Sequence, residues 1–235
     1  MPLPLKHLAV GLAAILLTTR VTPAQQPATR TIVLLDPAHG GPDTGAHLPN
    51  NVLEKDVTLA FAARLRAALA AGGFTVISTR DADPAGPFTP DQRAEIANHT
   101  HPNACVTLHA TSSGSGVHIV TSALNPPIDN VDPHAPIPWD TAQAASIPQS
   151  LALANQIGLA LEHTKLPVIL SRASLRPLDN FTCPAVAIEI APLAPPDSDA
   201  TPATDAAYEQ NIAKAIVSGL TSWRTRQFAA AGAAK

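Results

Sequence analysis

The segment Thr31-Ile-Val-Leu-Leu-Asp-Pro-Ala-His39 sets the architecture of this chain, because a compact apolar run ends abruptly at polar residues. Such a run is typical of a buried strand. Apolar residues then recur at helical spacing from Asp56 to Ala71, and Gly72-Gly73 stops this predicted helix. Phe74 to Thr79 predicts a second strand. Because strand–helix–strand units join parallel strands by right-handed crossovers, this part of the chain predicts a parallel sheet.

The rest of the sequence continues this alternation of strands and helices. Thr89-Pro90-Asp91 opens a short helix, and Ala104 to His109 predicts the next strand. Strands are also predicted at Val117–Thr121 and Pro184–Ile190, with a helix from Gln149 to His163 between them. The last helix has one apolar face, made by Tyr208, Ile212, Ile216, Leu220 and Trp223. The sequence therefore predicts an α/β fold with a largely parallel sheet.

Composition limits the class of protein. The chain has 235 residues, of which 46% are apolar, 3% aromatic and 14% charged. This length favours one domain over two, and the apolar content excludes a wholly disordered chain. The formal net charge of −3 argues against nucleic acid as a partner, because phosphate contacts need a basic surface.

The first residues have the layout of an export signal. Lys6 precedes an uncharged apolar run from Leu8 to Leu17, and Val21-Thr-Pro-Ala24 provides a cleavage point. A retained anchor is the less favoured alternative, because a bilayer span needs about 20 apolar residues. We expect residues 1–24 to be removed and residues 25–30 to form a short lead-in to an exported protein, periplasmic or extracellular. The signal carries two basic residues and no acid, so its removal changes the formal charge from −3 to −5.

The two cysteines, Cys105 and Cys183, are too few for a disulfide scaffold. An oxidising compartment would permit one bridge between them. Both lie in or beside predicted buried strands, where a free cysteine commonly serves as a small apolar residue. The sequence leaves the bridge open and favours free thiols.

Polar residues occur at the ends of three predicted strands. His39 lies just past the first strand, His109 ends the third, and Glu189 lies within the last. Because ligand sites of a mostly parallel sheet gather at the carboxyl ends of its strands, we expect these side chains to converge. Two imidazoles and a carboxylate make a catalytic zinc set. Glu54, just before the first long helix, is the candidate carboxylate; alternatively, it only stabilises the helix start.

Longer motifs surround these residues in a fixed order. They are Asp36-Pro-Ala-His-Gly-Gly41, Asp43-Thr-Gly45, Leu53-Glu-Lys-Asp-Val-Thr-Leu59, Thr79-Arg-Asp81, Arg93-Ala-Glu-Ile-Ala-Asn98, Thr107-Leu-His-Ala110, Gly116-Val117 and Pro184-Ala-Val-Ala-Ile-Glu189. Together they resemble the zinc-dependent N-acetylmuramoyl-L-alanine amidases of the amidase-3 family. The resemblance covers residues 31 to 222, nearly all of the predicted mature chain.

The resemblance implies a role for each candidate residue. It implies that His39, Glu54 and His109 bind one Zn²⁺ and that Glu189 is the catalytic carboxylate. It also implies a single α/β domain over residues 31–226, with a twisted, mostly parallel (mixed) sheet flanked by helices on both faces. The implied reaction is hydrolysis of the amide between N-acetylmuramic acid and L-alanine. Peptidoglycan is then the partner. We expect the protein to be a monomer, and a regulatory protein of unknown identity is a possible further partner.

The chain also departs from the family pattern. Thr111 stands where the family commonly has Asn, and Ile190-Ala-Pro-Leu-Ala-Pro195 replaces a Gly-Phe-Leu-Ser-Asn segment. These changes raise two alternatives: a wall-binding relative with weakened catalysis, and a zinc amidase or peptidase acting on another peptide amide. Glu189 favours catalysis over the first alternative, because a non-catalytic relative has little reason to keep it.

Several further residues and segments carry weaker expectations. Asp36 is a candidate partner that orients His39, the alternative being a plain turn residue. Arg176 is a candidate substrate-binding or supporting residue. The proline-rich segment 122–148 predicts an insertion that could gate the site or be a plain surface loop, and residues 227–235 predict a flexible tail. The other histidines are expected to be solvent-facing or structural: His47, His99, His101, His118, His134 and His163.

Overall fold

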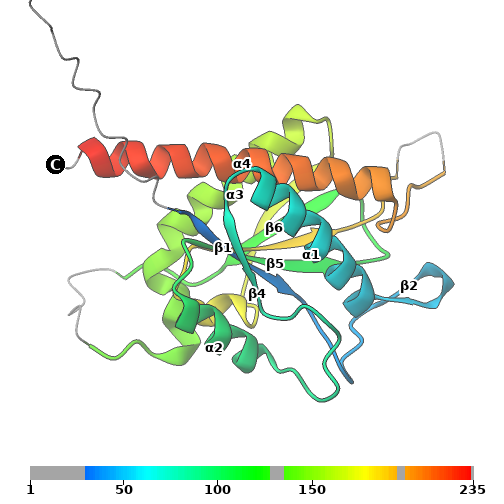
Figure 1. Ribbon diagram of the computed structural model, residues 1–235, viewed down its shortest axis with the longest axis horizontal. Coiled ribbons are helices and arrows are strands. Elements are labelled where there is room, and N and C mark those ends of the chain that lie inside the picture. The colour runs from blue at the N-terminus through cyan, green and yellow to red at the C-terminus, as the bar shows by residue number, and fades with distance from the viewer. Residues whose placement is uncertain (1–29, 128–134, 195–198, 234–235) are drawn as a thin grey trace, which may run out of the picture.

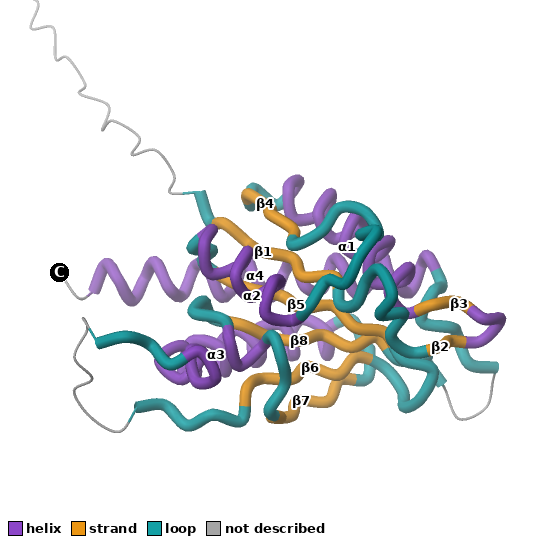
Figure 2. The backbone as a smooth tube through the Cα atoms, turned by 90° about the horizontal axis from the view of Figure 1, so that it is seen from below, coloured by secondary structure: helices purple, strands orange, loops and turns teal. Residues whose placement is uncertain are grey.

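A six-stranded sheet runs through the structure, a computed structural model that describes residues 30–127, 135–194 and 199–233. Figure 2 shows its strands side by side in the order β4-β1-β5-β8-β6-β7. The strand bounds are β1 (Ile32–Pro37), β4 (Thr75–Ser78), β5 (Ala104–Ala110), β6 (Val117–Ser122), β7 (Val168–Ala173) and β8 (Ala185–Ile190). The predicted export signal lies outside the described residues.

The strand directions confirm a mostly parallel, mixed sheet. The strands β4, β1, β5 and β8 run parallel to one another. β6 pairs antiparallel with β8, and β7 pairs parallel with β6. Because β6 runs the opposite way, its first residues lie beside the carboxyl end of β8, with Val117 opposite Ile190 and His118 opposite Glu189.

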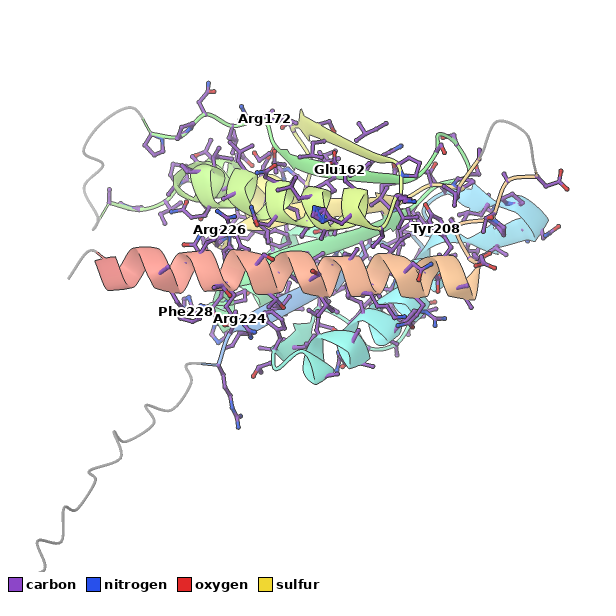
Figure 3. All side chains as sticks on the ribbon, turned by 90° about the horizontal axis from the view of Figure 1, so that it is seen from above. Glu162, Arg172, Tyr208, Arg224, Arg226 and Phe228 are labelled. Carbon is purple, nitrogen blue, oxygen red and sulfur yellow. A yellow bond between two sulfur atoms is a disulfide. The ribbon has the colours of Figure 1, made fainter. Side chains whose placement is uncertain are left out.

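Helices cover both faces of the sheet, as predicted (Figure 1). α1 (Glu54–Ala71), α3 (Ile147–His163) and α4 (Ala206–Ala233) pack on one face and share the larger apolar core with it. α2 (Pro90–Thr100) covers the other face through Ala94 and Ala97 and a smaller core. Figure 3 shows α4 lying across the first face, between α1 and α3.

Strand alternation decides which polar side chains reach the α2 face. Successive side chains of a strand point to opposite faces. On β5, Leu108 and Ala110 belong to the larger core, which leaves His109 pointing to the α2 face. On β8, Ile188 belongs to the same larger core, so Glu189 also points to the α2 face. The two polar residues therefore share one face at the carboxyl ends of adjacent strands.

Local sequence explains where the first two helices begin. Thr89 caps α2, because its side chain accepts a hydrogen bond from the Gln92 amide while the Gln92 side chain accepts one from the Thr89 amide. α1 begins at Glu54, two residues before the predicted start. Its first turn holds Glu54 and Asp56, whose negative charge suits the positive end of a helix dipole.

One edge strand and one hairpin have no counterpart among the predicted strands. One is β7, an edge strand whose side chains are mostly exposed and which therefore lacks a buried-strand pattern. The other is a hairpin of β2 (His47–Leu48) and β3 (Val52–Leu53), joined by the short helix η1 (Pro49–Asn51). Its strands are too short for a periodic pattern to be visible. The hairpin leads directly into Glu54 at the start of α1.

The proline-rich segment 122–148 is partly packed into the fold. It contains the helix η2 (Trp139–Ser146) and the first residues of α3. The buried side-chain amide of Gln143 donates hydrogen bonds to the carbonyls of Phe181 and Cys183, just beyond η3 (Leu178–Asn180). Residues 128–134 of the segment lie outside the described residues, so its gating role stays a prediction.

Cys105 and Cys183 form a disulfide, the alternative that the sequence left open but did not favour. Cys105 lies on β5, opposite Ala185 of β8, and Cys183 lies two residues before Ala185. The pairing of these two strands therefore brings the sulfurs together across the α2 face. The sequence could not give this result, because it does not report which strands are neighbours.

The C-terminal helix is longer than predicted. α4 continues to Ala233, whereas the sequence predicts a flexible tail over residues 227–235. Alanine is the strongest helix former, which accounts for the extension through the alanine-rich end. In the described ranges of the chain, no helix combines the length and the apolarity needed to span a bilayer.

Candidate active site

Three side chains that are distant in sequence meet at one edge of the sheet. His39 lies on the loop after β1, Glu54 is the first residue of α1, and His109 lies near the end of β5. Each offers one ligand atom, and these atoms lie within 4.8 Å of one another. The three residues that the family resemblance implies as metal ligands therefore lie together in the structure.

The Glu54 carboxylate lies at the centre of this cluster. Its Oε1 accepts a hydrogen bond from Nδ1 of His109 at 2.8 Å, and its Oε2 lies 3.1 Å from Nε2 of His39. Oε2 also accepts a bond from the amide of Ala46 at 2.7 Å, and Oε1 accepts one from the amide of Ala110 at 3.2 Å. Burial alone would raise the pKa of Glu54, but the bonds from His109, His39 and the Ala46 amide hold it well below its usual range. Glu54 is therefore a carboxylate anion, the form that binds metal.

The His39 loop is strained and firmly held. His39 has a backbone φ of 65°, in the left-handed region that few non-glycine residues adopt. The Arg80 guanidinium donates hydrogen bonds to the carbonyls of Pro37, Ala38 and Lys55, which ties this loop to the start of α1. Burial lowers the pKa of His39, but its bonds with Glu54 and Asp43 outweigh burial and raise it.

Gly45 packs against the cluster so closely that no side chain fits there. A β-carbon on Gly45 would lie 2.6 Å from Oε2 of Glu54 and 2.6 Å from Cδ2 of His39. The Gly45 backbone also has a φ of 64°, which favours glycine. The backbone thus forms a wall around the ligand atoms. Two imidazoles and one carboxylate, confined in this way, fit the three-ligand set of a catalytic zinc site.

Glu189 lies beside His109 of this cluster. It is the register partner of His109 on the adjacent strand, and strands in a sheet are about 4.8 Å apart. Its side chain is 39% exposed, so it can meet a substrate. Among the described residues its carboxylate has a side-chain partner in His118, whose Nδ1 lies 2.9 Å from Oε2 of Glu189.

His118 is the site residue that the sequence analysis missed, since it was grouped with the solvent-facing or structural histidines. It lies on β6, and Nδ1 of its ring is hydrogen-bonded to the carboxylate of Glu189. The signal was present in the sequence, because His118 sits in an alternating strand pattern directly after Gly116-Val117. Finding it required knowing that β6 runs antiparallel beside β8.

The expectation that Asp36 orients His39 is wrong. The Asp36 carboxylate is buried and accepts hydrogen bonds from Arg93, Thr79 and Thr107. Burial alone would raise the pKa of Asp36, but the charge of Arg93 and these bonds lower it. The partner of Nδ1 of His39 is Asp43, at 2.9 Å.

Arg176 is not part of the site either. Its guanidinium pairs with Asp91, at the start of α2, and with Asp140, in η2. Within the part of the chain that the structure describes, no contact joins it to the His39, Glu54 and His109 cluster or to Glu189. The expectation of a substrate-binding or supporting role is therefore corrected to a surface ion pair.

A hollow of about 410 Å³ lies between the β2–β3 hairpin, the residues just after β5 and the loop after β8. Thr111 and Ser112, just after His109, form one part of its wall, and the β2–β3 hairpin before Glu54 forms another. The remaining wall is the loop after β8. The residues that line the hollow are mostly apolar and none is charged: Leu48, Pro49, Asn50, Val52, Thr111, Ser112, Pro192, Ala200, Pro202, Ala203 and Thr204.

Comparison with known proteins identifies the family. Residues 33–222 match the Amidase_3 family, described as N-acetylmuramoyl-L-alanine amidase. An N-acetylmuramoyl-L-alanine amidase of Mycobacterium tuberculosis is 29% identical over 225 residues, which cover 83% of this chain and 87% of that protein. A germination-specific N-acetylmuramoyl-L-alanine amidase of Bacillus subtilis is 36% identical over 101 residues, which cover 37% of this chain and 41% of that protein.

Solved structures show the same fold. The CwlD amidase of Clostridioides difficile, solved in complex with the GerS lipoprotein, superposes with a TM-score of 0.61 at 20% identity, over 83% of this chain and 99% of that one. The resemblance seen in the sequence motifs is therefore confirmed, and the chain belongs to the Amidase_3 family of N-acetylmuramoyl-L-alanine amidases.

Proposed function

We propose that this protein is an exported, zinc-dependent amidase that hydrolyses the bond between N-acetylmuramic acid and L-alanine in peptidoglycan. The observation that carries the proposal is the cluster of His39, Glu54 and His109 with Glu189 next to it in strand register. A metal-ligand set with a carboxylate beside it can catalyse the hydrolysis of an amide. Family membership supplies the substrate class.

Zinc would be held by His39, Glu54 and His109. The donor set is right for zinc, and the ionised state of Glu54 and the wall formed by Gly45 both favour a bound cation. When bound, Zn²⁺ would supply a Lewis acid that polarises the amide carbonyl and acidifies water. No other cofactor is needed for this reaction.

Glu189 would act as the general base and then the general acid. Its carboxylate accepts a proton from the attacking water as the new C–O bond forms at the lactyl carbonyl carbon. The same proton then passes to the nitrogen of L-alanine as the C–N bond breaks. The products are a free lactyl carboxylate on the glycan and a peptide with a new amino terminus. The partial exposure of Glu189 leaves it accessible for both transfers.

The hollow between the β2–β3 hairpin and the loop after β8 would receive part of the substrate. Its lining is uncharged, and the predicted mature chain is acidic, so attraction to an often anionic wall does not arise from net charge. Binding would instead depend on shape and apolar contact within this hollow. Its walls include Thr111 and Pro192, which lie in the two segments that depart from the family pattern, so substrate preference would be set there.

The proposal also includes export of the protein and binding of a regulatory partner. The layout of residues 1–24 favours export, and the Cys105–Cys183 disulfide is of the kind that persists in an oxidising compartment. Because a cell-wall hydrolase endangers its own cell, a regulatory partner is expected. The related CwlD amidase is solved in complex with a lipoprotein, which is a precedent for such control.

The direct test is hydrolysis of purified peptidoglycan by the purified protein loaded with zinc. We expect new L-alanine amino termini to appear while the glycan strands stay intact, and a chelator should stop the release. Absence of release from several wall types would contradict the proposal. Release from free peptides alone would favour the alternative of another peptide amide.

Two variants test the assigned roles. Glu189→Gln should abolish release while keeping one bound zinc, whereas His39→Ala should lose the metal. Glu162→Gln, an exposed acid on α3, is the matched control and should behave like wild type. Wild-type activity in Glu189→Gln would show that the role given to Glu189 is wrong.

A further inference from the structure

His118 is the residue whose side chain is hydrogen-bonded to Glu189. It lies on β6 directly opposite Glu189 on β8, and its Nδ1 lies 2.9 Å from Oε2 of the carboxylate. We propose that His118 is a positioning residue, which holds the Glu189 carboxylate in the orientation needed for proton transfer. The inference rests on the proposed function, because it gives His118 a part in the same reaction.

The His118 ring is itself held in place. Its side chain is only 21% exposed. The backbone of Gly114 lies against the ring, since a β-carbon there would be 2.9 Å from Cε1 of His118. The strand pairing of β6 with β8 holds the backbone of His118 in place. A rigid donor of this kind is what orienting a flexible side chain requires.

The surroundings of the ring determine which nitrogen carries the proton. Nε2 of His118 is buried and has no hydrogen-bond partner among the described residues. A proton on Nε2 would leave a buried donor without an acceptor, which is costly. Nδ1 faces the Glu189 carboxylate instead. The favoured tautomer thus carries its proton on Nδ1, and His118 donates to Glu189.

The hydrogen bond to His118 gives the two carboxylate oxygens of Glu189 different roles. A partly exposed glutamate side chain samples several rotamers when nothing restrains it. The bond to His118 engages Oε2, and no other side chain in the described part of the chain is hydrogen-bonded to Oε1 of Glu189. Oε1 is therefore available to accept the proton of the attacking water. Because a displacement of about 1 Å can lower a rate about 100-fold, loss of this restraint should be measurable.

The test uses three variants of the purified, zinc-loaded protein on peptidoglycan. His118→Leu keeps an apolar side chain of comparable size but removes the donor. His118→Asn places an amide N–H near the position of Nδ1 and should restore the bond. His163→Leu is the matched control, because His163 is exposed at the end of α3. Bound zinc and melting temperature are measured for each protein.

We expect His118→Leu to lower kcat about 10- to 100-fold with KM and bound zinc unchanged. His118→Asn should recover most of the lost kcat, and His163→Leu should match wild type. If His118→Leu does not fold, His118→Ala takes its place with the same expected loss. The inference would be overturned if a folded His118→Leu or His118→Ala variant kept the wild-type kcat. It would also be overturned if His118→Asn did not recover the lost kcat. An inactive wild type would instead contradict the proposed function, so the two failures are distinguishable.

Discussion

The Asp43 carboxylate is hydrogen-bonded to the His39 ring: Oδ2 of Asp43 lies 2.9 Å from Nδ1 of His39, which is four residues earlier in the chain. This bond fixes the proton on Nδ1 and turns Nε2 toward Glu54, 3.1 Å away. Burial raises the pKa of Asp43, but its bonds with His39 and the Gly45 amide outweigh burial and lower it. Asp43 is therefore an ionised acceptor that presents His39 in the form a metal ligand needs.

Removing Asp43 should weaken zinc binding. We expect Asp43→Ala to raise the zinc dissociation constant about 10- to 100-fold, the usual cost of losing a carboxylate behind a histidine ligand. Competition with a chromogenic chelator measures this constant. Asp56→Ala, an exposed acid in the first turn of α1, is the control and should bind zinc like wild type. Equal affinity in the two variants would contradict the role given to Asp43.

Gly45 allows a sharper test of the metal centre. We expect Gly45→Ala to lose zinc and activity, because the new β-carbon would lie 2.6 Å from both Glu54 Oε2 and His39 Cδ2. The variant must displace one of these ligands. Bound zinc, measured by elemental analysis after gel filtration, reports the outcome.

Gly73→Ala is the matched control for backbone strain. Gly73 also has a left-handed φ, of 78°, but a β-carbon there would meet nothing within 4 Å. Its cost is therefore only the conformational strain of a non-glycine residue, about 1–2 kcal/mol of stability. Zinc retained by Gly45→Ala would show that the site tolerates the displacement, and zinc lost by Gly73→Ala would show that strain alone explains the loss.

The sequence predicted much of the candidate site because parallel strands place their carboxyl ends together. His109 and Glu189 each end or nearly end an apolar strand pattern, so a parallel sheet places both at the same edge. That they are direct neighbours follows from the pairing of β5 with β8. Glu54 was predicted through its place before α1 and the family motif around it. These residues needed only local patterns and one general rule of topology.

The remaining features depend on which strands are neighbours. His118 reaches Glu189 only because β6 turns back antiparallel beside β8, and no local pattern reports that pairing. The Cys105–Cys183 bridge likewise depends on β5 lying next to β8. The prediction for Asp36 was wrong because its position in the motif, three residues before His39, suggested His39 as its partner. The carboxylate instead forms an ion pair with Arg93, which lies on a helix far along the chain.

Asp36 should matter for stability and not for chemistry. Asp36→Asn would leave Arg93, only 3% exposed, as a buried charge without its partner. Breaking such a pair costs about 3–5 kcal/mol of the free energy of unfolding. Urea unfolding measures this cost. Asp140→Asn, which removes one acid of an exposed ion pair with Arg176, should cost about 0–1 kcal/mol.

The contribution of Asp36 should also depend on pH. The pKa of Asp36 is lowered in the folded protein, whereas an unfolded Asp titrates at about 3.9. The stabilisation is therefore fully present above about pH 4–5 and is lost as the pH falls through the folded pKa. We expect the stability difference between wild type and Asp36→Asn to be constant from about pH 5 to 7 and to shrink below about pH 4. A difference that grows in acid would contradict this assignment.

Filling the hollow between the β2–β3 hairpin and the loop after β8 should impair substrate binding without affecting the proposed zinc. Ala200 lines this hollow and is exposed, so Ala200→Trp can occupy it without disturbing the core. We expect KM for peptidoglycan fragments to rise about tenfold, equivalent to about 1.4 kcal/mol, with bound zinc unchanged. Ala229→Trp, at an exposed position near the far end of α4, controls for a surface tryptophan. An unchanged KM in Ala200→Trp would place the substrate elsewhere, and the loop after β8 would then not set specificity.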